Sequence, residues 1–422
     1  MPLVLCPSMV ARERTRITYR YELLRAASSG IIETAGTTFL LTIAVRAYEA
    51  GSLAKAVVAG AASVGLLLSP LVVGRVTRAG QAPSRAASRI LAVGAVAFLI
   101  AAVMPWLPVF VLCSLVGMAS SACIIPLLTH MYQENYPEKE RGRLFSRTVM
   151  IRIATAAAFS KLAGDALSGD IDRFRWLLVV FGVALGFASF CLARCPTDPI
   201  PREAGAHEAH PLQALRFVRD DPLFRRTLIC WMLMGFANLM MLPLRVEYLA
   251  NPRFHQGEVL TIGTVALLTG VIPNLARLVM SPVWGHLFDR MNFFALRITL
   301  NVGFAVGILT FFTSQSFSGM VVGAVVFGIS TAGGDVAWSL WVTKFAPPGR
   351  VADYMSAHTF LTGVRGVIAP VAAFYAVGEV PLVWLAIFNG GLILIATALL
   401  IPEIKFGKKA RRGAALAEEI SE

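Results

Sequence analysis

The chain has 422 residues, of which 56% are hydrophobic and only 15% are charged. Soluble globular domains carry about 45–50% apolar and about 25% charged residues, so this composition excludes an ordinary soluble domain and favours a membrane protein. The formal net charge of +13 would suit nucleic-acid binding only if it formed a patch interleaved with aromatic residues, and the sequence has none.

Apolar runs of about 20 residues, the length that crosses about 30 Å of hydrocarbon, recur along the whole chain. Charges interrupt the first, fifth and eleventh of these runs. The pattern predicts an all-α membrane protein with twelve transmembrane helices. We expect them at residues 22–46, 53–74, 90–108, 109–131, 148–168, 175–194, 226–249, 259–284, 297–315, 318–343, 354–377 and 381–402.

The two halves of the chain repeat one another. Residues 68–74 and 280–285 each contain a Ser-Pro pair followed by a glycine and then a charged loop, and residues 45–48 and 244–248 close the first and seventh runs with an arginine and a tyrosine. A duplicated bundle usually holds its site at the interface between the halves. We therefore expect two pseudo-symmetric six-helix bundles. The predicted divisions are a cytoplasmic N-terminus (1–21), an N-terminal bundle (22–194), a cytoplasmic linker (195–225), a C-terminal bundle (226–402) and a cytoplasmic tail (403–422).

Most of the 38 lysines and arginines lie in the segments that would share one side of the membrane with both chain ends. Cytoplasmic loops carry such an excess, so the distribution predicts that both ends are cytoplasmic. In a bacterium the protein would lie in the inner membrane, because helical bundles do not suit an outer membrane. The same asymmetry accounts for the net charge without nucleic acid.

One loop points to a family. After the eighth run, Gly285 is followed by Asp289 and Arg290, and Arg297 opens the next helix. This resembles the Gly-x-x-x-Asp-Arg signature of the major facilitator superfamily, and the resemblance implies two rocking halves and a carboxylate that latches one gate state. The equivalent loop of the first half departs from the signature, because Arg78 stands where the aspartate would lie.

Charges within the runs are the candidate pathway residues, since a charge near the bilayer centre costs about 2.5–3.5 kcal/mol. The third, sixth, ninth and twelfth runs carry none in their interiors, and in the fold that this chain resembles these four helices form the outer support. The candidates for the substrate or proton pathway are Glu33, Lys161, Arg277, Asp335, His358 and Arg365.

Each candidate has a functional and a structural interpretation. Glu33 suits a proton-loading carboxylate, or it forms a structural ion pair with an arginine from another helix. Arg365, with His358 on roughly the same face, suits binding of a carboxylate or phosphate, or it pairs permanently with Glu33 or Asp335. Asp335 is a second proton site or the counter-ion of Arg365.

Three basic residues within the runs differ in their expected depth. Lys161 is the strongest cavity candidate of the three, although Asp165 lies one turn away and would neutralise it. Arg152 and Arg277 lie nearer helix ends and would extend toward the headgroups. Arg152 and Lys161 lie on opposite faces of their helix, so only one of them can face a central cavity.

These features predict a secondary transporter that moves a small organic solute, anionic or zwitterionic, by alternating access with coupling to protons. Two alternatives stay open: a proton-driven exporter of cationic or amphipathic drugs, and a non-transporting receptor or scaffold with the same fold. We expect a monomer in membrane lipid that is not an enzyme and uses no cofactor or metal. The sequence shows no nucleotide-binding loop, metal cluster or catalytic triad.

Overall fold

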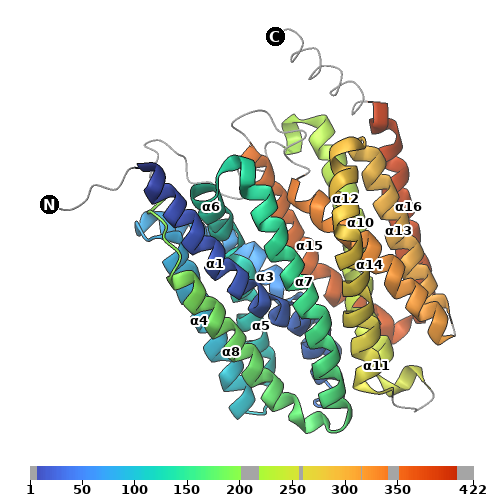
Figure 1. The fold of residues 1–422 in the computed structure, drawn as a ribbon. Helices are drawn as coiled ribbons and strands as arrows, with labels where there is room; N and C mark the ends of the chain where they lie inside the picture. Colours follow the sequence, from blue (N-terminus) through green and yellow to red (C-terminus); the bar gives the residue numbers. More distant parts are fainter. Residues whose placement is uncertain (1–6, 201–217, 256–259, 315, 341–350, 406–422) are drawn as a thin grey trace.

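The structure, a computed structural model, describes residues 7–200, 218–255, 260–314, 316–340 and 351–405. Within them the chain runs from one end of the bundle to the other twelve times, so the twelve predicted spans are confirmed (Figure 1). The N-terminal half contains α1 (Pro7–Thr34), η1 (Ala35–Phe39), α2 (Leu40–Arg46), α3 (Ser52–Arg78), α4 (Pro83–Val103), α5 (Leu107–Cys123), α6 (Ile125–Asn135), α7 (Glu138–Ser168), η2 (Ile171–Arg173) and α8 (Phe174–Ala193).

The C-terminal half repeats this order of spans. Its elements are α10 (Pro222–Ala250), η3 (Pro252–Phe254), α11 (Ile262–Ala266), η4 (Leu267–Val271), α12 (Ile272–Arg290), α13 (Phe293–Thr313), α14 (Phe317–Leu340), α15 (Val351–Glu379), α16 (Leu382–Leu400) and η6 (Ile401–Glu403). Helix α1 begins and α16 ends at the same end of the bundle (Figure 1). We call this the terminal end and the opposite one the distal end.

Proline residues set several of the helix limits. Helices α4 and α10 begin at Pro83 and Pro222, where the missing proline N–H would have no partner in any case. The fourth span is divided into α5 and α6 at Ile124, two residues before Pro126 in the first turn of α6. Helix α1 starts 15 residues before the predicted span, because the charged segment before residue 22 continues the helix.

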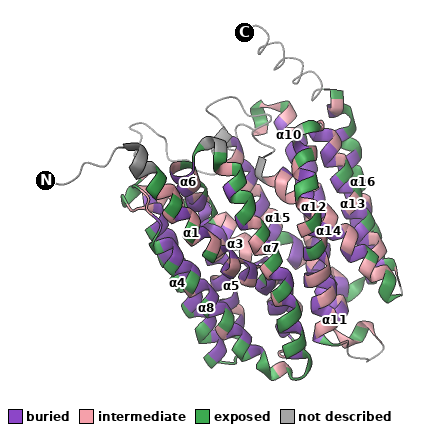
Figure 2. Cartoon of the chain, in the orientation of Figure 1, coloured by how far each residue is buried: buried purple, intermediate pink, exposed green. Residues whose placement is uncertain are grey.

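Each half has its own apolar core. The four spans without interior charges lie on the flanks, α4 and α8 on one side and α13 and α16 on the other (Figure 1). Their outward positions are apolar and exposed, which Figure 2 shows as green segments along these helices. Exposed apolar rows of this kind face lipid.

Helix α7 differs from the other spans. Eleven spans among the described residues are long and apolar enough to cross a membrane by composition, and α7, with 31 residues, is the twelfth. It packs against α1 of its own half and against α11, η4 and α12 of the other half. A helix between the halves can carry charges that a lipid-facing helix cannot, because the partners lie on neighbouring helices.

Candidate functional site

Four charged side chains meet between the two halves. Arg277 on α12 donates from Nε to Oδ2 of Asp335 on α14 over 2.6 Å, and its Nη1 donates to Glu33 on α1. Arg152 on α7 places its Nε 3.1 Å from Oε2 of Glu33. Each half thus contributes one arginine and one carboxylate. We call these four residues the central network.

The burial of Arg277 makes its pairing in the central network electrostatically demanding. The side chain of Arg277 is 8% exposed and that of Asp335 is 41% exposed. A buried charge that loses its partner is strongly destabilising, whereas a complete pair is tolerated. Asn274 adds a further acceptor, with its Oδ1 3.3 Å from Nη1 of Arg277. Arg277 is therefore the residue whose pairing ties the halves together at this depth.

Close backbone packing brings Arg152 to Glu33. A Cβ on Gly30 would meet the carbonyl oxygen of Arg152 and the side chain of Thr155, so α1 and α7 approach too closely for a larger residue. Glu33 lies one turn beyond Gly30 on α1. The glycine thus allows the Glu33 carboxylate to reach a guanidinium of the neighbouring helix.

Two π-helical turns flank the central network. The turn η1 follows Glu33 closely on the first span, and η4 precedes Arg277 on the eighth. Buried hydroxyls join the turns across the halves, with Oγ1 of Thr38 and Oγ1 of Thr269 3.1 Å apart. Such turns are rare in helices and are frequent at functional sites. The two turns place an adaptable stretch of backbone beside Glu33 and another beside Arg277.

The halves are also tied together toward the distal end. Lys55 on α3 donates to Oε1 of Glu247 on α10 over 2.7 Å, and both residues are buried. Arg46 donates to the carbonyl oxygen of Leu260 over 2.8 Å. Ser168 accepts from the backbone N–H of Gly263 over 2.7 Å. We call these three contacts the distal seam. They hold the distal side closed in this conformation.

Polar contacts near the terminal end follow another pattern in the described part of the chain, because each stays within one half. Arg14 pairs with Glu134 over 3.0 Å in the N-terminal half. Tyr354 donates to Asp221 over 3.1 Å in the C-terminal half. The described contacts thus join the halves at the centre and the distal end.

A second cluster of charges lies inside the C-terminal half. Arg297 on α13 is 2% exposed and lies with Cζ 3.8 Å from the centre of the Trp231 ring on α10. Arg365 on α15 donates to the carbonyl oxygen of Trp231. The ring of His358 packs against Trp231 and against Trp338 on α14. Neither arginine has a carboxylate within 4.0 Å among the described residues.

The family follows from the twelve spans, the repeated halves and a match of the sequence itself. Residues 23–293 and, in a second overlapping alignment, 254–419 match the Major Facilitator Superfamily. The chain belongs to this superfamily. It is therefore a multi-pass integral membrane protein and a secondary transporter. No curated protein sequence matches the chain.

Solved structures of the superfamily share the fold at low sequence identity. The nucleoside transporter NupG superposes with a TM-score of 0.70 at 12% identity, over 92% of this chain and 98% of that one. A D-xylose-proton symporter gives 0.68 at 16% identity, over 92% and 96%. The human organic anion transporter MFSD10 (TETRAN) gives 0.64 at 15%, over 92% and 99%. Identities this low show the fold and leave the solute open.

The residues of the superfamily loop motif lie at the terminal end of α12 and at the start of α13. Gly285 and Arg290 lie in the last two turns of α12 at the terminal end. The side chain of Asp289 lies outside the described residues, so the latch predicted for it stays a prediction. Arg297, predicted to open the next helix, lies one turn inside α13 and is buried against Trp231.

The candidate pathway residues separate into three groups. Glu33, Arg277 and Asp335 lie together in the central network, while Arg365 and His358 lie in the C-terminal cluster. Lys161 joins neither group. Its Nζ lies 2.7 Å from Asp165, and both side chains are more than half exposed.

The network member that sequence reasoning passed over is Arg152. Arg152 and Lys161 lie on opposite faces of their helix, so one of them faces away from the other helices. The spacing of the two residues does not show which one it is. Lys55 and Glu247 were passed over as well, because both lie near helix ends where charges are ordinary. Among the described residues, no group of histidine, cysteine, aspartate or glutamate side chains could hold a metal ion.

Proposed function

We propose that this transporter moves a small organic anion or zwitterion, and that Arg277 is the group that recognises its negative charge. The observation that carries the proposal is that Arg277 holds carboxylates from both halves at once. A solute carboxylate or phosphate has the same chemistry as these side chains and can replace one of them. A guanidinium suits this exchange because its fork of donors binds such groups bidentately.

Replacement of a side-chain carboxylate would loosen the tie between the halves. With the solute on Arg277, either Glu33 or Asp335 is released from the arginine that both acids share. The halves are then free to rock, and the distal seam can open. If the terminal end is cytoplasmic, as the basic loops predict, the distal seam closes the opposite, non-cytoplasmic side.

Proton coupling follows from the same exchange. A carboxylate that leaves a guanidinium loses the charge that stabilised its ionised form, so taking up a proton becomes favourable. One negative charge arrives with the solute and one proton neutralises the displaced acid. The superfamily fold accommodates both properties, since one structural neighbour is a proton symporter and another an organic anion transporter. Each chain contains a complete interface between halves, so we expect a monomer to suffice.

Ligand binding to the purified protein tests the proposal first. We would measure the melting temperature at pH 6 and pH 8 with a pool of mono- and dicarboxylates and phosphate esters, and separately with a pool of lipophilic cations. A ligand that binds the folded state raises the melting temperature according to its concentration and affinity. We expect stabilisation by an anion in the first pool, and loss of that stabilisation in Arg277→Gln.

The matched control is Lys161→Gln, which removes a positive charge from an exposed pair outside the central network. It should leave the anion response intact. Stabilisation by the cation pool that is lost in Glu33→Gln would overturn the proposal in favour of drug export.

Flux decides between a transporter of anions and a binding protein. The anion found in the melting screen would be supplied to sealed proteoliposomes with and without a pH gradient. We expect uptake to depend on the gradient and to lose that dependence in Glu33→Gln or Asp335→Asn. Binding without flux in sealed vesicles would favour the receptor alternative, and unchanged dependence in both variants would remove proton coupling from the proposal.

A further inference from the structure

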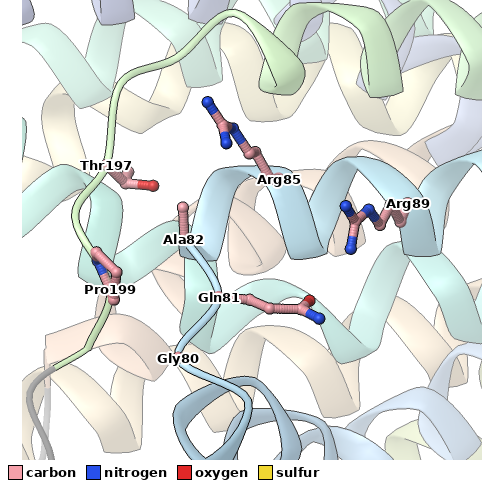
Figure 3. A pocket seen from close by; sticks show the side chains of 7 residues that line it. All are labelled: Gly80, Gln81, Ala82, Arg85, Arg89, Thr197 and Pro199. Atoms are coloured by element: carbon pink, nitrogen blue, oxygen red, sulfur yellow. The ribbon is translucent and has the colours of Figure 1, made fainter.

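A basic hollow lies on the surface of the N-terminal half at the terminal end. It is formed by the turn between α3 and α4, the first turns of α4 and the segment after α8. Figure 3 shows Thr197 and Pro199 on one side of the hollow and the side chains of α4 on the other. The lining residues are Gly80, Gln81, Ala82, Arg85, Arg89, Thr197 and Pro199.

The two arginines of the hollow lack acidic partners. Arg85 and Arg89 lie one turn apart on α4, both are exposed, and neither has a carboxylate within 4.0 Å among the described residues. The nearest acid along the lining segment, Asp198, lies 2.9 Å from Arg14. Two unpaired guanidinium groups beside the first turn of a 21-residue helix attract an anion, because the helix N-terminus adds partial positive charge.

An apolar stripe continues from these arginines along the same face of α4. Val93, Val96, Ile100 and Val103 follow Arg89 at helical spacing and are 60%, 54%, 42% and 73% exposed. From Arg89 to Val103 the stripe runs about 20 Å at 1.5 Å per residue. An anion site joined to an exposed apolar stripe of this length suits an amphiphile with a charged head and an acyl chain.

The loop before the hollow adds to this chemistry. In the superfamily signature an aspartate occupies the position that Arg78 holds here, so the degenerate loop replaces a negative charge with a positive one. Arg78 lies in the last turn of α3, five residues before α4 begins. The departure from the motif thus leaves this turn between α3 and α4 without the carboxylate of the signature.

We propose that the hollow binds the phosphate of an anionic phospholipid headgroup, with an acyl chain along the α4 stripe. Arg85 and Arg89 contact the phosphate, and Gln81 and Thr197 supply further polar groups at the rim. Basic residues at the cytoplasmic side of helical bundles bind such headgroups, each contributing about a fivefold gain in affinity. The site lies outside the interface between the halves and takes no part in binding the transported solute.

The test compares lipids by their effect on the full-length protein in detergent. We would titrate dioleoylphosphatidylglycerol, dioleoylphosphatidylcholine and inorganic phosphate, and follow the melting temperature and the number of retained lipids by native mass spectrometry. We expect phosphatidylglycerol to stabilise and to be retained. The double variant Arg85→Gln/Arg89→Gln should weaken its apparent affinity by roughly 25-fold, while Arg85→Lys/Arg89→Lys should keep most of it.

The matched control is Arg143→Gln/Arg147→Gln. These two exposed arginines lie at the same spacing near the terminal end of α7, so the control removes the same charge from the same half. It should leave the phosphatidylglycerol response unchanged. Equal loss in both double variants would overturn the site, because the effect would then follow net charge alone. Equal stabilisation by inorganic phosphate would overturn the lipid assignment.

Discussion

The distal seam makes a prediction about the balance between conformations. Glu247 is fully buried, and its Oε1 lies 2.7 Å from Nζ of Lys55, which is itself 7% exposed. Replacing Glu247 with leucine leaves the ammonium group of Lys55 buried without a counter-ion, which costs about 3–5 kcal/mol. The cost falls on the distal-closed conformation, because opening the distal side returns Lys55 to water. About 3 kcal/mol shifts the ratio of closed to open molecules by roughly 100-fold.

A cysteine at Ala56 reports the opening. Ala56 is 1% exposed and belongs to the apolar cluster of the C-terminal half, although it lies on α3 of the N-terminal half. A membrane-impermeant maleimide applied to the distal side should label Ala56→Cys slowly, and much faster when Glu247→Leu is added. The five native cysteines that the structure describes are buried, and the parent protein measures any background.

The double variant Lys55→Met/Glu247→Leu is the control. It replaces the buried pair with apolar side chains, which is often neutral, so labelling of the cysteine should return toward the slow rate. Labelling of Ala56→Cys that stays slow with Glu247→Leu alone would refute the reasoning that this pair holds the distal side closed. Fast labelling in the double variant would show that the substitutions loosen the packing of α3 and α10 instead.

Two further predictions concern packing and the π-helical turns. Gly30→Ala should lower the melting temperature, because the added Cβ would meet the backbone oxygen of Arg152. The control Gly391→Ala should leave the melting temperature unchanged or raise it, since a Cβ at Gly391 would enter open space. Equal effects of the two substitutions would contradict this account. Thr38→Val/Thr269→Val removes one buried hydrogen bond across the halves, worth about 1 kcal/mol, so maleimide labelling of the distal side should rise about fivefold. No rise would mean that the hydroxyl pair does not favour the closed conformation.

Much of the architecture was predictable from local composition. Apolar runs indicated the twelve spans, and the absence of charges from the third, sixth, ninth and twelfth placed those helices on the lipid-facing flanks. The loop around Gly285 and Arg290 indicated the superfamily from its residue pattern alone. These predictions succeed because the cost of placing a side chain in lipid is set residue by residue and adds along one helix.

The pairing of charges required the tertiary structure. Glu33 and Arg277 are 244 residues apart, and Lys55 and Glu247 are 192 apart, so no local pattern links them. The periodicity of α7 could separate two basic residues onto opposite faces, but only the close approach permitted at Gly30 determines that Arg152 meets Glu33.

The sequence by itself therefore determined the membrane spans, the repeated halves, the family and a short list of interior charges. The tertiary structure alone decided which of these charges share one site, which side of the interface between the halves is closed, and that Arg297 is buried against Trp231. The physical reason is that hydrophobic burial is a property of each helix, whereas an ion pair depends on distances of a few ångströms between helices.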